Sequence, residues 1–328
     1  MLNQTVRSRW AGPLVALGVG SCAQPPIPAP MQAATPTPAA MEGAIRMFRS
    51  DKPIAEKGGR TLPLWLVEAR VAWPSAKGQV STSAIVDTGA QTTLIDRRFA
   101  VANGLPVESS NVVAKDFAGN KLETSVINHV TLELGPLRSQ PLKVIVVELP
   151  ALFQELGIGI IWSPQTSVPK GSMLRFDFGA GTATLRPESA MPQDVTPLCK
   201  AGDASMQAAA TIVSASIAGQ AVRLQLDSGA TKLGLSSASS VVRLLQQAPG
   251  SSVGERIGAG GAQRTLEVPP QELKLAGQTY VASVSVAETN DSTPGPCDTD
   301  GEIGLEVLQH CTVDLASDRF ALLCRPAQ

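Results

Sequence analysis

The chain has 328 residues, of which 27 are basic and 28 acidic, so its formal net charge is only −1. Such a balance gives no strong electrostatic field and does not favour a nucleic-acid partner. The length allows two or three domains, and the 29 glycines and 25 prolines between short valine-, threonine- and leucine-rich runs predict a turn-rich, mostly β protein.

The N-terminal segment predicts export. Residues 1–22 combine the basic Arg7 and Arg9 with an apolar stretch ending at Cys22, which is the layout of a bacterial secretion signal. The surroundings of Cys22 resemble a lipoprotein signal, in which the cysteine becomes the lipidated N-terminus, although Gly20 departs from the usual pattern. A plain cleaved signal and a cytosolic start with a chance apolar run are the alternatives. Residues 23–45, rich in alanine and proline, are expected to form a tether, so we expect a periplasmic or membrane-anchored protein.

The elements predicted after the tether form two similar series. The first has strands at 64–73 and 79–86, a helix capped by Asp96 that ends near Gly104, a hairpin at 114–122, and closing strands at 176–178 and 183–187. The second has strands at 211–217 and 221–226, a helix capped by Ser236 or Ser237, a hairpin at 257–265, and closing strands at 313–315 and 322–326. The series predict a first lobe at 46–187, a connection at 188–204 and a second lobe at 205–328.

One motif stands at the same place in both series. Ala84-Ile85-Val86-Asp87-Thr88-Gly89-Ala90 recurs as Leu224-Gln225-Leu226-Asp227-Ser228-Gly229-Ala230. An apolar strand followed by Asp-Thr/Ser-Gly resembles the signature of pepsin-like and retroviral aspartic proteases. The resemblance implies a mostly β, bilobal acid-protease fold of β-barrel type with a cleft between two homologous lobes. It also implies an aspartic endopeptidase with Asp87 and Asp227 as catalytic residues.

The resemblance extends to the residues around the two aspartates. Thr88 and Ser228 are expected to bond to backbone across the two lobes, and Gly89 and Gly229 to let the loops approach closely. The implied substrate is an extended peptide or protein, and no cofactor or metal is implied. Because one chain carries both aspartates, a monomer is expected.

The implied chemistry rests on two adjacent carboxyl groups. Two carboxylates in close contact cannot both ionise, so the pair shares one proton, and its ionised member activates a water molecule. Both motifs continue with alanine, Ala90 and Ala230, where a hydroxyl could stabilise the charged form. We therefore expect activity in mildly acidic to near-neutral conditions.

Further family features are matched less closely. Gly157-Ile158-Gly159 and Glu302-Ile303-Gly304 are the candidates for the apolar-apolar-Gly segments that brace the aspartate loops. Phe117 and Gly119 in the first half, and Gly260 and Gly261 in the second, are the candidates for mobile flaps over a substrate. The tyrosine of pepsin-like flaps is missing there, since Tyr280 is the single tyrosine.

Four cysteines besides Cys22 predict disulfides in an exported chain. They are Cys199, Cys297, Cys311 and Cys324, which allow three pairings. A predicted hairpin between the last two favours Cys311–Cys324, which leaves Cys199–Cys297. None has a metal-ligand spacing, and the two histidines, His129 and His310, are expected to be structural or on the surface.

Two readings without catalysis remain open. The chain could bind peptide in its cleft without cutting it, or serve as a scaffold in the cell envelope, because a fold alone does not establish an activity. Asp177 and Asp314 also recur in the two series, and their place in closing strand–turn segments favours a structural role.

Overall fold

The computed structural model describes residues 43–50, 53–54, 60–61, 63–75, 78–117, 119–200, 207–246, 249–287 and 297–327. The predicted signal, Cys22 and most of the predicted tether lie outside these residues. Strand β1 (Gly43–Arg49) begins inside the stretch predicted as tether, because Ile45 and Met47 are buried in the core. In the part of the chain that is described, no helix is both long and apolar enough to cross a bilayer.

Six strands close into a first β-barrel, which confirms the predicted mostly β fold. Around the barrel, β4 pairs with β5, then β13, β6, β12 and β10 follow, and β10 returns to β4. The strands are β4 (Trp65–Ala72), β5 (Val80–Val86), β6 (Leu94–Asp96), β10 (Ser125–Leu134), β12 (Leu142–Val147) and β13 (Ile158–Trp162). Short strands add to this part of the chain: β2 (Pro53–Ile54), β3 (Arg60–Thr61), β7 (Glu108–Ser109), β8 (Ala114–Lys115), β9 (Lys121–Leu122) and β11 (Leu137–Arg138).

A second ring of strands repeats the pairing of the first. Here β19 pairs with β20, then β25, β21, β24 and β23 follow, and β23 returns to β19. In each ring two equivalent strand pairs are parallel: β5–β13 and β6–β12 in the first, β20–β25 and β21–β24 in the second. The equivalent strands β10 and β23 also show a register shift, β10 against β12 and β23 against β24. The strands are β19 (Ile212–Ile217), β20 (Gln220–Leu226), β21 (Leu233–Ser236), β23 (Gly261–Leu275), β24 (Gln278–Ala287) and β25 (Gly301–Ile303), with β22 (Ser252–Gly258) added at the edge of β23.

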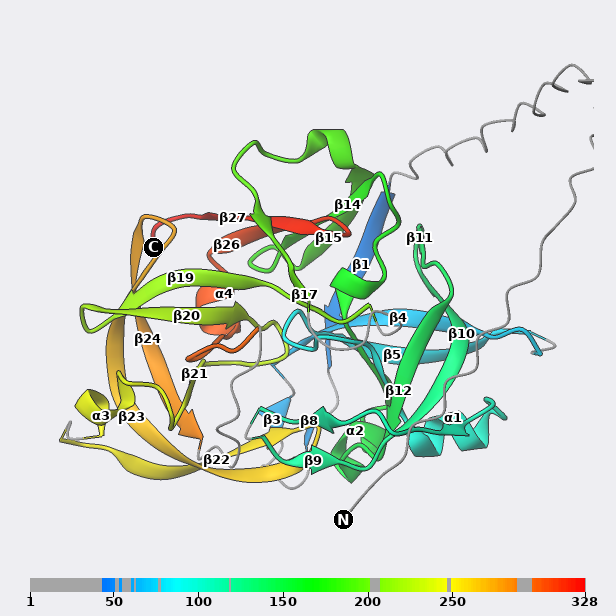
Figure 1. The fold of residues 1–328 in the computed structure, drawn as a ribbon, viewed down its shortest axis with the longest axis horizontal. Helices are drawn as coiled ribbons and strands as arrows, with labels where there is room; N and C mark the ends of the chain where they lie inside the picture. The colour runs from blue at the N-terminus through cyan, green and yellow to red at the C-terminus, as the bar shows by residue number, and fades with distance from the viewer. Residues whose placement is uncertain are drawn as a thin grey trace, which may run out of the picture. The chain divides into compact units, whose positions relative to one another are not determined.

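A further run of strands joins segments from both halves of the chain (Figure 1). It contains β1, β15 (Thr182–Pro187), β14 (Ser172–Asp177), β26 (Cys311–Leu315), β27 (Arg319–Cys324) and β16 (Thr196–Pro197). The two predicted closing segments pair with each other, since Phe176 lies opposite Val313. Next to this pair, Arg175 donates two hydrogen bonds of 2.6 Å to the carboxylate of Asp314. Asp314 is therefore an ion-pair partner inside the sheet.

The stretch 188–204, predicted as a connection, contains paired backbone in its described part. Thr196 lies opposite Phe320 of β27, and β17 (Cys199–Lys200) pairs with β18 (Ala209–Ala210). These pairings tie the segment to strands that come later in the sequence.

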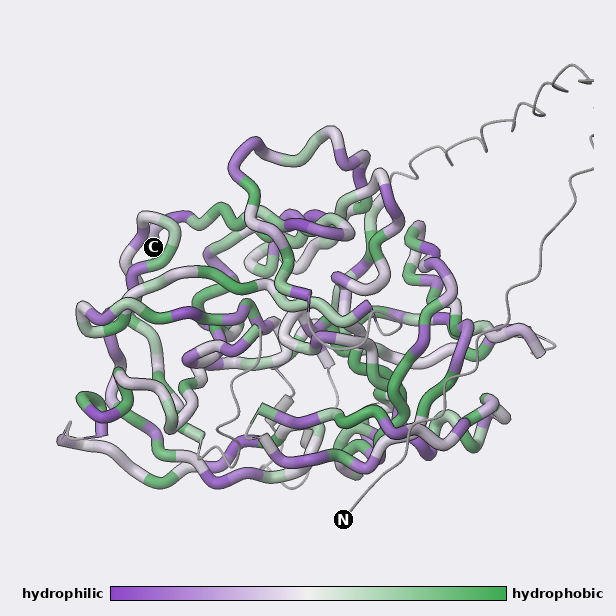
Figure 2. The backbone as a smooth tube through the Cα atoms, in the orientation of Figure 1, coloured by the Kyte–Doolittle hydropathy of each residue, from purple (hydrophilic) through white to green (hydrophobic). Residues whose placement is uncertain are grey.

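Side-chain alternation explains why the barrel strands form. In β4, Val67, Ala69 and Val71 on one face are buried, whereas Glu68 and Arg70 on the other face are exposed, as expected for a strand with one face on a core. By contrast, β12 is apolar except for Lys143, and Figure 2 shows most of it in the hydrophobic colour. Such strands are typical of sheet that is covered on both faces.

The helices are short, and one of the two predicted caps is wrong. They are α1 (Arg97–Ala102), α2 (Ala151–Glu155), α3 (Val242–Leu245) and α4 (Leu305–Leu308), with 3₁₀ turns at Pro164–Thr166 and Glu188–Ala190. Asp96 caps α1 as predicted, because its carboxylate accepts the N–H of Phe99. Neither Ser236 nor Ser237 caps α3, which follows Val241. Instead the Ser236 hydroxyl accepts the N–H of Ala238 and starts a separate turn before the helix.

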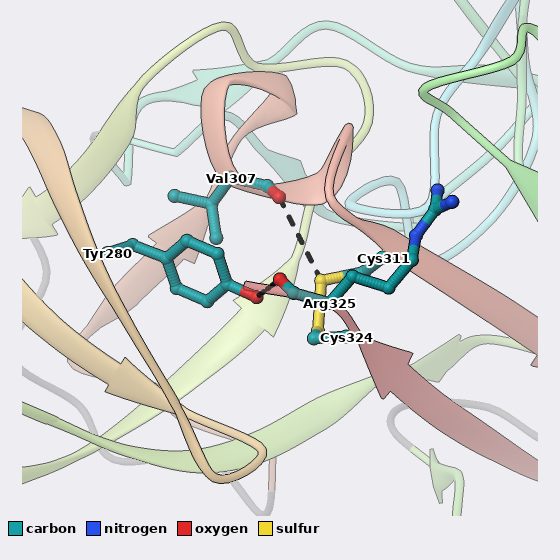
Figure 3. The surroundings of a disulfide bond; sticks show 5 residues. All are labelled: Tyr280, Val307, Cys311, Cys324 and Arg325. Carbon is teal, nitrogen blue, oxygen red and sulfur yellow. Dashed lines mark hydrogen bonds between the residues drawn. A yellow bond between two sulfur atoms is a disulfide. The ribbon is translucent and has the colours of Figure 1, made fainter. Parts of the chain in front are cut away.

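Both disulfides that the sequence favoured are present, Cys199–Cys297 and Cys311–Cys324. The second joins residues directly opposite each other on β26 and β27. Figure 3 shows its surroundings, where the Tyr280 hydroxyl donates to the carbonyl oxygen of Arg325 at 2.6 Å. This bond ties β24 to the end of the chain beside the disulfide.

Removing either disulfide should lower stability. Replacing both cysteines of a pair by alanine is expected to reduce the free energy of unfolding by about 2–4 kcal/mol, because the unfolded chain regains the freedom that the link removed. Urea unfolding of the two paired variants measures this loss. As a control, the wild type in reductant should approach the stability of the variant that lacks all four cysteines, and an unchanged midpoint in reductant would contradict the expectation.

Candidate active site

The two recurring motifs lie at the ends of equivalent barrel strands. Asp87 follows β5 and Asp227 follows β20. The backbone N–H of Asp87 donates to the carbonyl oxygen of Trp162, and that of Asp227 to the carbonyl oxygen of Ile303, both at 2.9 Å. Each aspartate is thus held where its strand leaves the barrel, by the parallel neighbouring strand.

Two hydroxyl groups join the aspartate loops reciprocally. The Thr88 hydroxyl donates to the carbonyl oxygen of Leu226 (2.9 Å) and accepts the N–H of Ser228 (3.0 Å). The Ser228 hydroxyl donates to the carbonyl oxygen of Val86 (2.7 Å) and accepts the N–H of Thr88 (3.1 Å). Both side chains are fully buried, so these four bonds are shielded from water.

The two motif glycines permit a close approach of the loops. A Cβ on Gly89 would overlap the carboxyl group of Asp227, and one on Gly229 would lie 2.6 Å from the carboxyl carbon of Asp87. Any side chain at either position would therefore displace the opposite aspartate. The two aspartate loops therefore contact each other through all six motif residues, which are Asp87, Thr88, Gly89, Asp227, Ser228 and Gly229.

The carboxyl groups of Asp87 and Asp227 lie close together, since each is packed against the motif glycine of the opposite loop. Burial and then the negative charge of Asp227 raise the pKa of Asp87 well above its ordinary value. The N–H groups of Ala90 and Gly89, each 2.8 Å from Asp87 Oδ1, act in the opposite direction. The pair therefore retains a proton at a pH where an isolated aspartate has lost it.

A third carboxyl group, that of Glu302 on β25, lies beside the same guanidinium of Arg256 as Asp227. Burial and then the charge of Asp227 raise the pKa of Glu302 well above its ordinary value, while the neighbouring Arg256 opposes this change. Burial alone would lower the pKa of Arg256, but the charges of Glu302, Asp227 and Asp87 raise it. The site thus holds three carboxyl groups and one guanidinium.

The predicted brace of the first aspartate loop is wrong in its position. Because the N–H of Asp87 bonds to Trp162, the segment equivalent to Ile303 is centred on Trp162, four residues after the predicted Ile158. Gly159 lies elsewhere on β13, where it packs against Phe99 and Thr82. In the second half the predicted Gly304 does contact the aspartate loop, since a Cβ there would overlap the backbone of Lys232.

The two predicted flap hairpins contact each other. The first consists of β8 and β9, and the second of β22 and β23 with its turn at Gly258–Gly261. Asp116, in the first hairpin, accepts a hydrogen bond from Gln263 and lies against Gly260. Phe117 stacks under the guanidinium of Arg256, with 4.6 Å between Cζ and the ring centroid. Gly119 and Gly261 both have positive φ angles, +80° and +104°, which glycine adopts readily at such turns.

Two glutamines near the aspartate loops were not anticipated. Gln225 donates to the carbonyl oxygen of Gly89 at 2.6 Å, and Gln165 donates to the carbonyl oxygens of Thr88 and Ala90 at 3.2 and 2.6 Å. Gln225 gave no signal in the sequence, because β20 also contains Gln220 and Arg223. Glu302 is the one charged residue of β25, and that was the available signal for it.

The histidines lie away from the aspartates. His310 stacks on Tyr280 with ring centroids 5.6 Å apart. His129 is exposed at the register shift of β10, with a φ of +58°.

Comparison with known proteins points to one family. Residues 69–165 match a family model described as aspartyl protease. No curated protein matches the chain. Among solved structures, an aspartic proteinase from Irpex lacteus is similar, with 14% identity, a TM-score of 0.45, and coverage of 86% of this chain and 97% of that one. The part of this chain that is similar to the aspartyl protease family, residues 69–165, contains Asp87 and most of the first barrel.

Proposed function

We propose that the chain is an aspartic endopeptidase in which Asp87 and Asp227 form the catalytic pair. The observation that carries this proposal is the close approach of their two carboxyl groups, each packed against the opposite motif glycine at the ends of equivalent strands. A shared proton in such a pair lets one carboxylate take a proton from water while the other acid protonates the carbonyl oxygen of the peptide. The elevated pKa of Asp87 supports activity in mildly acidic to near-neutral conditions.

The proposal includes the organisation of the molecule. The repeated strand pairing supports two lobes, at 46–187 and 205–328, that contribute one aspartate each. A peptide or protein would bind in extended form between them and under the hairpins that carry Phe117, Gly119, Gly260 and Gly261. A monomer suffices, because both aspartates come from one chain.

We further propose that the protein is exported. Two disulfides fit an oxidising compartment such as the bacterial periplasm. Cys22 would carry a lipid anchor, and residues 23–45 would tether the folded part to it.

The decisive experiment is cleavage of a denatured protein mixture by the purified protein, from pH 3 to pH 8. The wild type should cut, and the variants Asp87→Asn and Asp227→Asn should not, because neither can share a proton between two carboxyl groups. Mass spectrometry of the products would identify the bonds cut. Cutting that persists in both variants would refute the mechanism. A folded wild type that cuts nothing would favour the non-catalytic peptide-binding or scaffold function.

A further inference from the structure

A single guanidinium group connects the candidate dyad to both hairpins. Arg256 lies on β22, and its Nη2 is 3.9 Å from Oδ2 of Asp227. Its Nη1 forms an ion pair with Glu302. The side chain of Arg256 is only 23% exposed, and those of Asp227 and Glu302 are 9% and 8% exposed. Little water screens these charges, so their interaction is stronger than that of a surface ion pair.

Glu302 occupies a position that is apolar in the first barrel. On β25 it lies opposite Gln225, whereas on β13 the equivalent residue, opposite Ile85, is Ile161. Room for the ion pair comes from Gly234, where a Cβ would lie 3.0 Å from Glu302 and 3.1 Å from Nη1 of Arg256. Burying a carboxyl group costs more than burying an apolar side chain, so packing alone does not account for Glu302.

The same guanidinium also contacts the opposite hairpin. It stacks on Phe117, and two residues that flank the contact, Asp116 and Gln263, are hydrogen-bonded to each other. The position of the cation therefore depends on contact between the two hairpins. When that contact is made, the cation lies beside Asp227.

Other charged groups near the site already have partners. From the first hairpin, Asp116 accepts hydrogen bonds from Gln263 and Asn120. From β23 and the loop after the second motif, Glu267 and Lys232 pair with each other at 2.7 Å. Among the described residues, the charged groups beside Asp227 are Asp87, Glu302 and Arg256.

We propose that Arg256 is a positioning residue of the active site, held by Glu302, and that its cation offsets the negative charge of the Asp87–Asp227 pair. This proposal rests on the proposed protease function. A cation beside the dyad favours its ionised forms, and an anion disfavours them. Loss of Arg256 should therefore move both limbs of the pH–rate profile to higher pH. Loss of Glu302 should move the limb at higher pH, where Glu302 is ionised, to lower pH, because Arg256 then acts on the dyad alone.

The test compares the purified wild type with Arg256→Met, Arg256→Lys, Glu302→Gln and the double variant Arg256→Met/Glu302→Gln. The measurement is kcat/KM for one peptide from pH 3 to pH 8. We expect Arg256→Met to shift the profile upward by about one pH unit and Glu302→Gln to shift its limb at higher pH downward. Arg256→Lys keeps the charge and should retain the wild-type limbs. The double variant removes one charge of each sign and should return close to them.

A structural role of Arg256 would give a different result. Both single variants would then lose rate at every pH without moving the limbs, or would move them in the same direction, and either result would overturn the proposal.

Urea unfolding of the same variants at each pH provides a readout that does not need catalysis. Arg256→Met should steepen the loss of stability between pH 4 and pH 8, since it leaves the buried carboxyl groups without a cation, and the double variant should not. If the wild type cuts no peptide but these slopes differ as expected, the protease function fails and the electrostatic role of Arg256 stands. If the wild type cuts peptide, and every variant keeps the wild-type pH–rate limbs and the wild-type dependence of stability on pH, the role of Arg256 is refuted and the protease function stands.

Discussion

Asp87→Asn should abolish peptide cleavage and at the same time stabilise the protein at neutral pH. Loss of the acid–base function is expected to lower kcat/KM by about 10³–10⁴-fold, because asparagine neither takes a proton from water nor gives one to the substrate. The fold should tolerate the change, since the Oδ1 of asparagine can still accept the N–H groups of Gly89 and Ala90, which now bond to Asp87 Oδ1.

The stabilisation follows from the pKa of Asp87. Burial and the charge of Asp227 raise this pKa in the folded protein, whereas in the unfolded chain an aspartate titrates near its ordinary value of about 3.9. Between these two pKa values the folded state binds more protons than the unfolded state, so its stability falls as the pH rises. Each unit of difference corresponds to about 1.4 kcal/mol. Asparagine does not titrate, so the variant escapes this loss.

Urea unfolding from pH 4 to pH 8 measures the effect. The advantage of Asp87→Asn over the wild type should be smallest near pH 4, grow as the pH rises towards the pKa in the folded state, and then level off. Asp314→Asn is the matched control, because it changes a buried aspartate that is ion-paired with Arg175. That variant should be destabilised at neutral pH. A difference between Asp87→Asn and wild type that does not depend on pH would contradict the prediction.

Removal of the two buried hydroxyl groups that join the aspartate loops should cost both stability and activity. Ser228→Ala leaves the N–H of Thr88 and the carbonyl oxygen of Val86 without this partner. Thr88→Val leaves the N–H of Ser228 without it, whereas the carbonyl oxygen of Leu226 keeps the Thr211 hydroxyl at 3.3 Å. A buried group that loses its partner costs about 1–3 kcal/mol, so Ser228→Ala should lose about 2–4 kcal/mol of unfolding free energy and Thr88→Val about 1–3 kcal/mol. Because the hydroxyls position the dyad, kcat should also fall by at least about tenfold, as expected when reacting groups move apart.

A double-mutant cycle tests whether the two hydroxyls act as one unit. The combined variant should lose clearly less than the sum of the single losses, because loss of either hydroxyl already lets the two loops separate and weakens the bonds of the other hydroxyl. Thr131→Val on β10 is a matched control, and it should change neither stability nor kcat appreciably. Additive losses in the cycle would show that the two loops are held independently.

Local pattern in the sequence determined much of this protein. Alternating and continuous apolar runs predicted the mostly β fold, and turn residues predicted the hairpins at β8–β9 and β22–β23. The pairing of Cys311 with Cys324 followed from one hairpin, and Cys199 with Cys297 by elimination. The recurrence of the Asp87 and Asp227 motifs selected the candidate site. These features depend on neighbours in sequence or on direct repetition, which a sequence displays without a structure.

The tertiary structure alone decided which residues surround the two aspartates. Parallel pairing of β13 with β5 placed Trp162, not Ile158, behind Asp87, and no local pattern specifies that register. The packing of β22 against the second ring brought Arg256 beside Glu302 of β25. The sequence signalled this ion pair only through the acidic Glu302 in a short strand. Such contacts depend on which strands meet when each ring closes. That choice is made by the free energy of the whole packed core and cannot be read from one segment.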